Sequence, residues 1–179
     1  RHLQTAAGLT GRLPSSRRPA QCRDSGCPVP SEHFRYWITV ENKLHGCTLL
    51  IPRSAFDKVA GFNERVRTTQ DYDLWFRMAK EFQFMHIPKF LVKSRSHPDQ
   101  GSHKMAGIAL AECNDLLSNF IRGLDPQEII SATAKALTES YAEIASSMFN
   151  RGFNEAGFLP ETFARRAGIT SNSKMTGMT

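Results

Sequence analysis

Two aspartates, Asp71 and Asp73, are the residues of this sequence best suited to chemistry. Asp71 stands four positions before Trp75, and Asp73 stands four positions before Arg77. On a helix, residues two apart point in directions about 200° apart, so the two carboxylates would face different partners. The spacing predicts a surface ion pair between Asp73 and Arg77 and leaves Asp71 on the face of the aromatic Trp75.

Asp71 has two ordinary roles at the start of a helix. The first-turn N–H groups stabilise a negative charge, and such a carboxylate can accept a proton from a reacting hydroxyl as a general base. Aspartate also caps helices without any catalytic role. The residue type and position alone favour the cap.

Several short elements are expected to position this helix. Leu44–Ile51, Phe82–Ile87 and Phe90–Lys93 have the length and apolar character of strands. Residues 54–60 have a helical start signal and are followed by a glycine, and Thr68 opens the helix that carries the aspartates. The pattern indicates an α/β region.

The following part of the chain has a helical pattern. Apolar residues recur at three- and four-residue steps over Met105–Leu124 and again over Ile130–Met148. Asp125 followed by Pro126 is a strong helix start, with the aspartate as N-cap and proline at the first helical position. We expect the two helices to form an antiparallel hairpin.

Composition bounds the class of protein. Of a net charge of +6, residues 1–30 hold +4, as five arginines against one aspartate, so residues 31–179 carry only +2. No folded basic stripe remains, which argues against nucleic-acid binding. No apolar run is long enough to span a membrane. We expect a disordered or foreign tail at 1–33, an α/β region at 34–102, a helical region at 103–168 and a disordered tail at 169–179.

The order of motifs from residue 46 to residue 102 carries a family resemblance. The sequence reads G-C-T-L-L-I-P-R-S-A-F-D-K-V-A-G-F-N-E, then T-Q-D-Y-D-L-W-F-R-M-A, then F-Q-F-M-H-I-P and S-R-S-H-P-D-Q-G-S. This set resembles the C-terminal, acceptor-side half of bacterial family 2 glycosyltransferases. The resemblance implies an incomplete, Rossmann-like GT-A domain followed by the helical hairpin. It also implies inverting transfer from a nucleotide-sugar with a divalent cation, Mn²⁺ or Mg²⁺.

The resemblance assigns roles around the predicted helix. It places the catalytic base at Asp71 and favours that role over the cap. Gln70 is expected to contribute to substrate binding; it stands where the family often has Glu, and the change removes a charge beside the base. Gly46 leaves space for the acceptor. Trp75 could stack on a sugar ring, although a buried core position is the more common role for such a tryptophan.

Two further residues lie in the loop that, in many relatives, covers the donor diphosphate. His97 is the expected metal ligand, since a neutral imidazole can bind a metal or donate to phosphate. Arg95 is the companion for the diphosphate, because a guanidinium matches phosphate oxygens. The alternative for Arg95 is a solvated position in a polar loop.

The functional hypothesis is non-processive addition of a hexose-type sugar to a cell-surface glycan or lipid-linked acceptor. The processive Q-x-x-R-W signature is absent, and no D-x-D motif precedes Leu44. We therefore expect the chain alone to lack a donor site, to be inactive and to self-associate. The expected location is the cytoplasm, at the inner face of the membrane. The rival hypothesis is a non-catalytic helical interaction or oligomerisation module.

Overall fold

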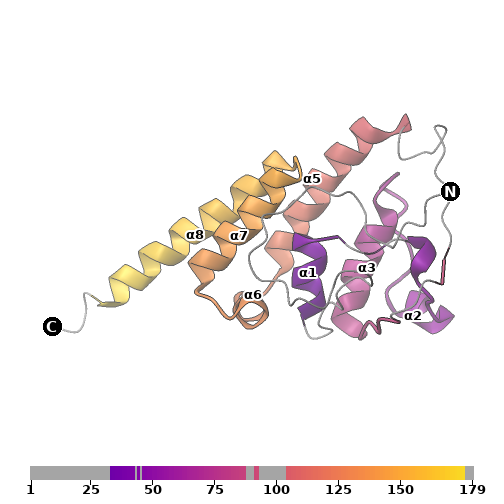
Figure 1. Cartoon of the computed structure of the whole chain (residues 1–179), viewed down its shortest axis with the longest axis horizontal. Coiled ribbons are helices and arrows are strands. Elements are labelled where there is room, and N and C mark those ends of the chain that lie inside the picture. The colour runs from indigo at the N-terminus through magenta and orange to yellow at the C-terminus, as the bar shows by residue number, and fades with distance from the viewer. Residues whose placement is uncertain (1–32, 43, 45, 88–90, 93–103, 176–179) are drawn as a thin grey trace. The chain divides into compact units, whose positions relative to one another are not determined.

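The computed structural model describes residues 33–42, 44, 46–87, 91–92 and 104–175, with only the backbone for 167–175. The regular elements of this described part are all helices (Figure 1). The chain divides into two compact units, residues 1–109 and residues 110–179. The expected tail at 1–33 lies outside the described residues except for His33. Of the tail expected at 169–179, the backbone of residues 169–175 belongs to α8, and the remaining residues lie outside the described part.

Among the described residues, the first unit contains three complete α-helices and one 3₁₀ turn. They are α1 (Phe34–Val40), the turn η2 (Gly46–Thr48), α2 (Arg53–Lys58) and α3 (Gln70–Glu81). α1 contacts α3, and the Tyr72 hydroxyl of α3 donates a hydrogen bond to the backbone carbonyl of Ile38 in α1. This bond links the first turn of α3 to the last turn of α1.

A small apolar core holds α2 against α3. Ala55 of α2 and Leu74 and Met78 of α3 are buried together. The last two are four residues apart and so lie on one helical stripe, as the sequence pattern predicts. Partly buried apolar residues complete the cluster: Ile51, Phe56, Val59, Phe82 and Phe84.

The expected α/β, Rossmann-like GT-A architecture is wrong for this chain, because the described residues form no strand and no sheet. Within the expected strand Leu44–Ile51, residues 46–48 form η2 and the other described residues are irregular. Phe82–Ile87 is irregular beyond the end of α3, as are Leu91 and Val92. A strand needs a neighbouring backbone for its N–H and C=O groups, and the described part supplies none to these segments.

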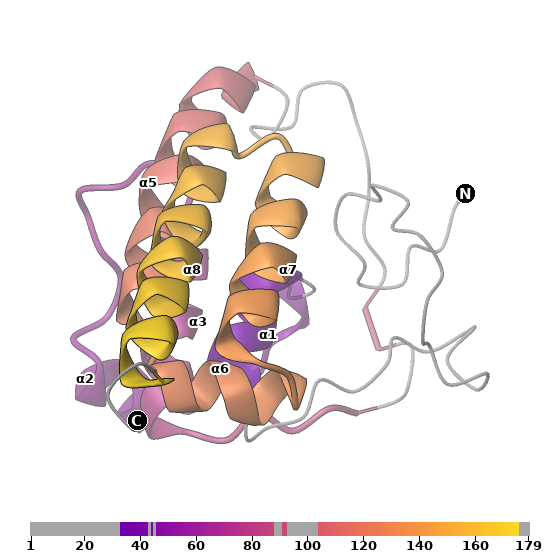
Figure 2. The ribbon, with the colours of Figure 1, turned by 90° about the vertical axis from the view of Figure 1, so that its left-hand side faces the viewer.

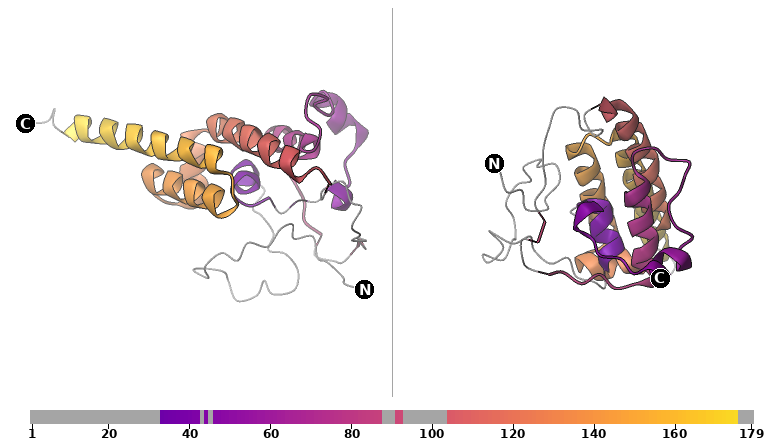
Figure 3. Two further views of the ribbon diagram at one scale, coloured as in Figure 1. Left: turned by 90° about the horizontal axis from the view of Figure 1, so that it is seen from above. Right: turned by 90° about the vertical axis from the view of Figure 1, so that its right-hand side faces the viewer.

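In the part of the chain that the structure describes, the second unit is built from four helices. α5 (Ala106–Gly123) enters it from the first unit, and α6 (Pro126–Thr133), α7 (Leu137–Asn150) and α8 (Asn154–Met175) follow. Asp125 caps α6 as predicted, because its Oδ1 accepts a hydrogen bond from the Gln127 N–H at 2.7 Å. The most extensive helix pair is α7 with α8, which run antiparallel and side by side (Figures 2 and 3).

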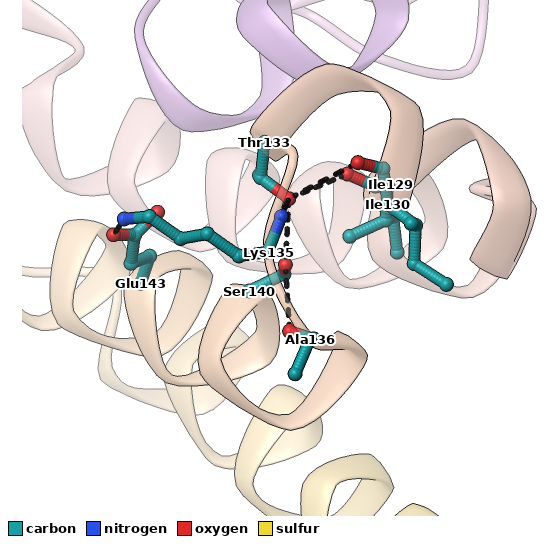
Figure 4. Close-up of polar contacts among 7 residues, drawn as sticks. All are labelled: Ile129, Ile130, Thr133, Lys135, Ala136, Ser140 and Glu143. Carbon is teal, nitrogen blue, oxygen red and sulfur yellow. Dashed lines mark hydrogen bonds and ion pairs between the residues drawn. The ribbon is translucent and has the colours of Figure 1, made fainter.

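The second predicted helix is interrupted between α6 and α7. Ala134 ends α6 in the left-handed conformation, with φ of 54°. The Thr133 hydroxyl lies 2.8 Å from that of Ser140 and donates to the Ile129 carbonyl at 2.9 Å, and Ser140 Oγ also bonds the Ala136 carbonyl (Figure 4). These bonds close the turn, so two helices stand where the sequence predicts one.

Close packing fixes α8 against its neighbours within the second unit. A Cβ added at Gly157 of α8 would lie 2.7–2.9 Å from three ring carbons of Phe149 in α7, so only glycine fits there. Gly152, with φ of 82°, forms the turn between these helices. The Asn114 side chain of α5 accepts a hydrogen bond from the Ala156 N–H and so satisfies the first turn of α8.

Candidate functional site

Asp71 lies in the first turn of α3, on the side that faces the turn η2. A Cβ added at Gly46 would lie 3.3 Å from Asp71 Oδ2 and 3.7 Å from Trp75 Cζ2. Gly46 is exposed and Asp71 is partly buried, and Asp71 Oδ1 accepts a hydrogen bond from the Tyr72 N–H at 2.7 Å. Three of the predicted site residues therefore meet at one place in the first unit.

The approach of Gly46 to Asp71 leaves little room for a side chain. A Cβ at 3.3 Å from a carboxylate oxygen is tighter than ordinary van der Waals contact, and larger side chains would cover that oxygen. Glycine leaves the backbone of η2 close to the carboxylate and leaves one side of Oδ2 uncovered by that residue. The position of Asp71 at the positive end of the α3 dipole favours its negative charge.

Asp73 points to a different partner, as the helical spacing predicts. Its Oδ2 accepts from Arg77 Nε at 3.0 Å and lies 2.8 Å from Arg77 Nη2. Arg77 also donates to the backbone carbonyls of Val59 and Gly61, at the end of α2. Asp73 is therefore a structural residue that holds Arg77 in place, and Asp71 is the carboxylate of the pair that lies beside Gly46.

Gln70 lies beside Asp71 as the first residue of α3. Its Oε1 is buried and accepts no hydrogen bond within the described part of the chain. Leaving a buried acceptor without a hydrogen bond costs about 1–3 kcal/mol. A hydrogen-bond donor from outside the described residues would therefore form a favourable bond with Gln70 Oε1. This is the one feature of Gln70 that fits the predicted binding role.

Trp75 is only 3% exposed and belongs to the core of the first unit. A ring this deeply buried offers no open face for stacking on a sugar. Only the edge atom Cζ2 comes close to Gly46, where it would lie 3.7 Å from an added Cβ, and the rest of the ring packs in the core. The core role that the sequence also allowed is the one that this burial supports.

Arg95 and His97, the predicted diphosphate and metal residues, lie outside the described residues. Among the described residues no group of three or more His, Cys, Asp or Glu side chains gathers where a metal ion could bind. The described helices include none long and apolar enough to cross a membrane.

Tyr72 positions this site, and no pattern in the sequence pointed to that role. The Tyr72 hydroxyl bonds the Ile38 carbonyl, and Tyr72 is 4% exposed. The bond fixes the residue next to Asp71 against α1. The N-cap of α1 is His33, which makes no side-chain capping hydrogen bond. Histidine is not one of the usual N-cap residues, so the sequence gives no start signal for this helix.

Comparison with known proteins supports a glycosyltransferase relationship. The chain is 38% identical over 107 residues to an uncharacterized glycosyltransferase of Rickettsia felis. The matched region covers 60% of this chain and 18% of the relative. A protein of the same description from Rickettsia bellii is 34% identical over 130 residues, or 71% of this chain and 19% of the relative. One from Rickettsia prowazekii is 39% identical over 87 residues, or 49% of this chain and 27% of the relative.

The chain thus spans about a fifth of the length of the Rickettsia felis and Rickettsia bellii relatives. No family model matches it, and no solved structure matches it with statistical significance.

Proposed function

We propose that the chain is the acceptor-side part of a glycosyltransferase and that Asp71 is its general base. The observation that carries the proposal is the approach of Gly46 to Asp71 Oδ2, together with the engagement of Asp73 by Arg77. One carboxylate is bound in an ion pair, and the other, partly buried at a helix N-terminus, faces an exposed glycine. The similarity to proteins named glycosyltransferases supports the same assignment.

The proposed chemistry is a single displacement at the anomeric carbon. Asp71 accepts the proton of an acceptor hydroxyl while the hydroxyl oxygen forms a bond to the sugar C1. The bond between C1 and the donor phosphate breaks, and its electron pair leaves with the nucleoside diphosphate. One displacement from the opposite face inverts the configuration. Among glycosyltransferases, the ordered motifs of residues 46–102 favour family 2, and a sequence without the Q-x-x-R-W signature favours non-processive addition.

The same family resemblance supports our proposals for the donor, the acceptor and the location of the reaction. The donor is a nucleotide-sugar, the acceptor is a cell-surface glycan or a lipid-linked sugar, and the reaction takes place on the cytoplasmic side of the membrane. A divalent cation, Mn²⁺ or Mg²⁺, would bind the donor diphosphate, but the described residues offer no cluster of ligands for it. We place the donor site in the additional polypeptide of the longer relatives, so the 179 residues alone should not transfer sugar.

A chimera tests the proposed function. The chain would replace the matching segment of the Rickettsia felis relative, and a panel of nucleotide-sugars would be assayed with Mn²⁺ and simple glycoside acceptors. We expect acceptor-dependent release of nucleoside diphosphate and a glycosylated product by mass spectrometry. A folded chimera without transfer, where the unaltered relative transfers sugar, would count against the proposal.

A substitution in the chimera tests the geometry of the site. Gly46→Val places a branched side chain against Asp71 Oδ2 and should reduce transfer while leaving the thermal stability nearly unchanged. Gly107→Val is the control, because a Cβ there meets nothing within 4 Å. Equal transfer by the Gly46→Val and control chimeras would show that Oδ2 is not the reacting oxygen.

A further inference from the structure

The segment Phe82–Ile87 lies directly after α3 (Figure 1). Over Phe82–Met85 its side chains alternate between partly buried and exposed. Phe82 and Phe84 pack on the core of the first unit, and the Phe84 ring stacks on Phe34 with centroids 4.1 Å apart. Gln83 is exposed, Met85 is 91% exposed and Ile87 is 54% exposed. Phe82 and Phe84 therefore anchor the segment, and beyond them Met85, His86 and Ile87 are all exposed.

The backbone of this segment is unpaired within the described part of the chain. Phe82 has the extended conformation, with φ of −136° and ψ of 149°, and its N–H bonds the Met78 carbonyl at the end of α3. The N–H and C=O groups of Gln83–Ile87 form no hydrogen bond with the described residues. Backbone groups without a partner beside exposed apolar side chains are the condition in which a strand is added from another chain.

We propose that Phe82–Ile87 pairs antiparallel with the same segment of a second copy of this chain. The pairing gives the unpaired backbone its partners and covers Met85 and Ile87. This interaction surface is independent of the chemistry at Asp71.

The composition of the segment favours a copy of itself as the partner. Gln83–Ile87 contains no Asp, Glu, Lys or Arg, so antiparallel self-pairing places no like charges opposite each other. It contains no proline, so every residue can donate its N–H. In natural proteins, charged residues and prolines on edge strands prevent self-pairing, and both are absent from these five residues. A two-fold axis through the pair closes the assembly at a dimer.

Association of the 179-residue chain tests the proposal. Sedimentation velocity over the micromolar range should show a reversible monomer–dimer equilibrium. Met85→Lys and Ile87→Lys should each shift it toward monomer by at least about tenfold in dissociation constant, because each replaces an apolar side chain that the pairing covers and brings one lysine from each copy into the same small pair. Hydrogen exchange should show amide protection within residues 83–87 that rises with protein concentration.

A matched substitution distinguishes pairing through Phe82–Ile87 from nonspecific hydrophobic association. Leu110→Lys removes an aliphatic side chain of helix α5 that is 48% exposed, close to the 54% of Ile87. It should dimerise like the unaltered chain. A monomer at all concentrations, equal weakening by Leu110→Lys and Ile87→Lys, or dimers whose residues 83–87 gain no protection would each overturn the proposal. If a lysine variant fails to fold by circular dichroism, the hydrogen-exchange result on the unaltered chain decides.

Discussion

Arg77 and Asp73 form an ion pair that also secures the end of α2. The helix ends with Ala60 and Gly61 both at positive φ, 60° and 68°, and the Gly61 N–H bonds the Phe56 carbonyl at 2.9 Å. Arg77 donates to the carbonyl of Gly61 at 2.7 Å and to that of Val59. A left-handed alanine is unfavourable, so the arginine and its aspartate hold the chain in a conformation that local preference opposes.

Arg77→Lys should lower the free energy of unfolding by about 1–2 kcal/mol. Lysine keeps the charge but cannot serve a carboxylate and two carbonyls from a planar fork. Urea denaturation monitored by circular dichroism measures the change. Arg122→Lys is the control, since Arg122 is exposed and bonds Asn119 at 3.3 Å, and it should be nearly neutral. Equal effects of the two substitutions would show that Arg77 does not stabilise the end of α2.

Gly157→Ala should destabilise the chain, because the added methyl meets the Phe149 ring at 2.7–2.9 Å. The expected loss is about 1–3 kcal/mol, the usual cost of overpacking. Gly107→Ala is the matched helical glycine: nothing lies within 4 Å of its added Cβ, and it should stabilise by up to about 1 kcal/mol. Thermal unfolding of both variants gives the comparison, and the same sign for both would contradict the packing of α7 on α8.

Ionisation of Tyr141 should lower the free energy of unfolding at alkaline pH. Burial, and then the Asp125 carboxylate, raise the pKa of the Tyr141 phenol above its ordinary value. A raised folded-state pKa contributes stability that is complete below the unfolded pKa of about 10 and is lost as pH rises through the folded pKa. Urea unfolding at a series of alkaline pH values should show a steeper loss for the unaltered chain than for Tyr141→Phe. Parallel curves would contradict this.

Local signals in the sequence predicted several features correctly. The pair Asp73 and Arg77 follows from helical spacing, and the cap at Asp125 follows from its proline neighbour. The start of α3 at Gln70 also lies within the predicted helix opening. Each of these features depends on residues within one turn of each other, which is why a sequence can show it.

Features that depend on distant partners were not predictable in the same way. Side chains alternate between partly buried and exposed over Phe82–Met85, but a strand also needs a second backbone, and the described residues provide none. The break at Ala134 lies in an alanine-rich stretch without glycine or proline, and the bond between Thr133 and Ser140 closes it. The approach of Gly46 to Asp71 joins residues distant in the sequence and exists only in the fold.

The most direct test of the central claim compares the two aspartates in the chimera. Asp71→Asn preserves shape and removes the base, so turnover should fall about 100-fold or more. Asp73→Asn weakens the ion pair with Arg77 and should lower stability while costing turnover far less. Both proteins would be assayed well below their unfolding temperatures, with the folded fraction checked by circular dichroism. A large loss for Asp71→Asn alone is the predicted result; equal losses in two folded variants, or none for Asp71→Asn, would contradict the assignment of Asp71 as the base.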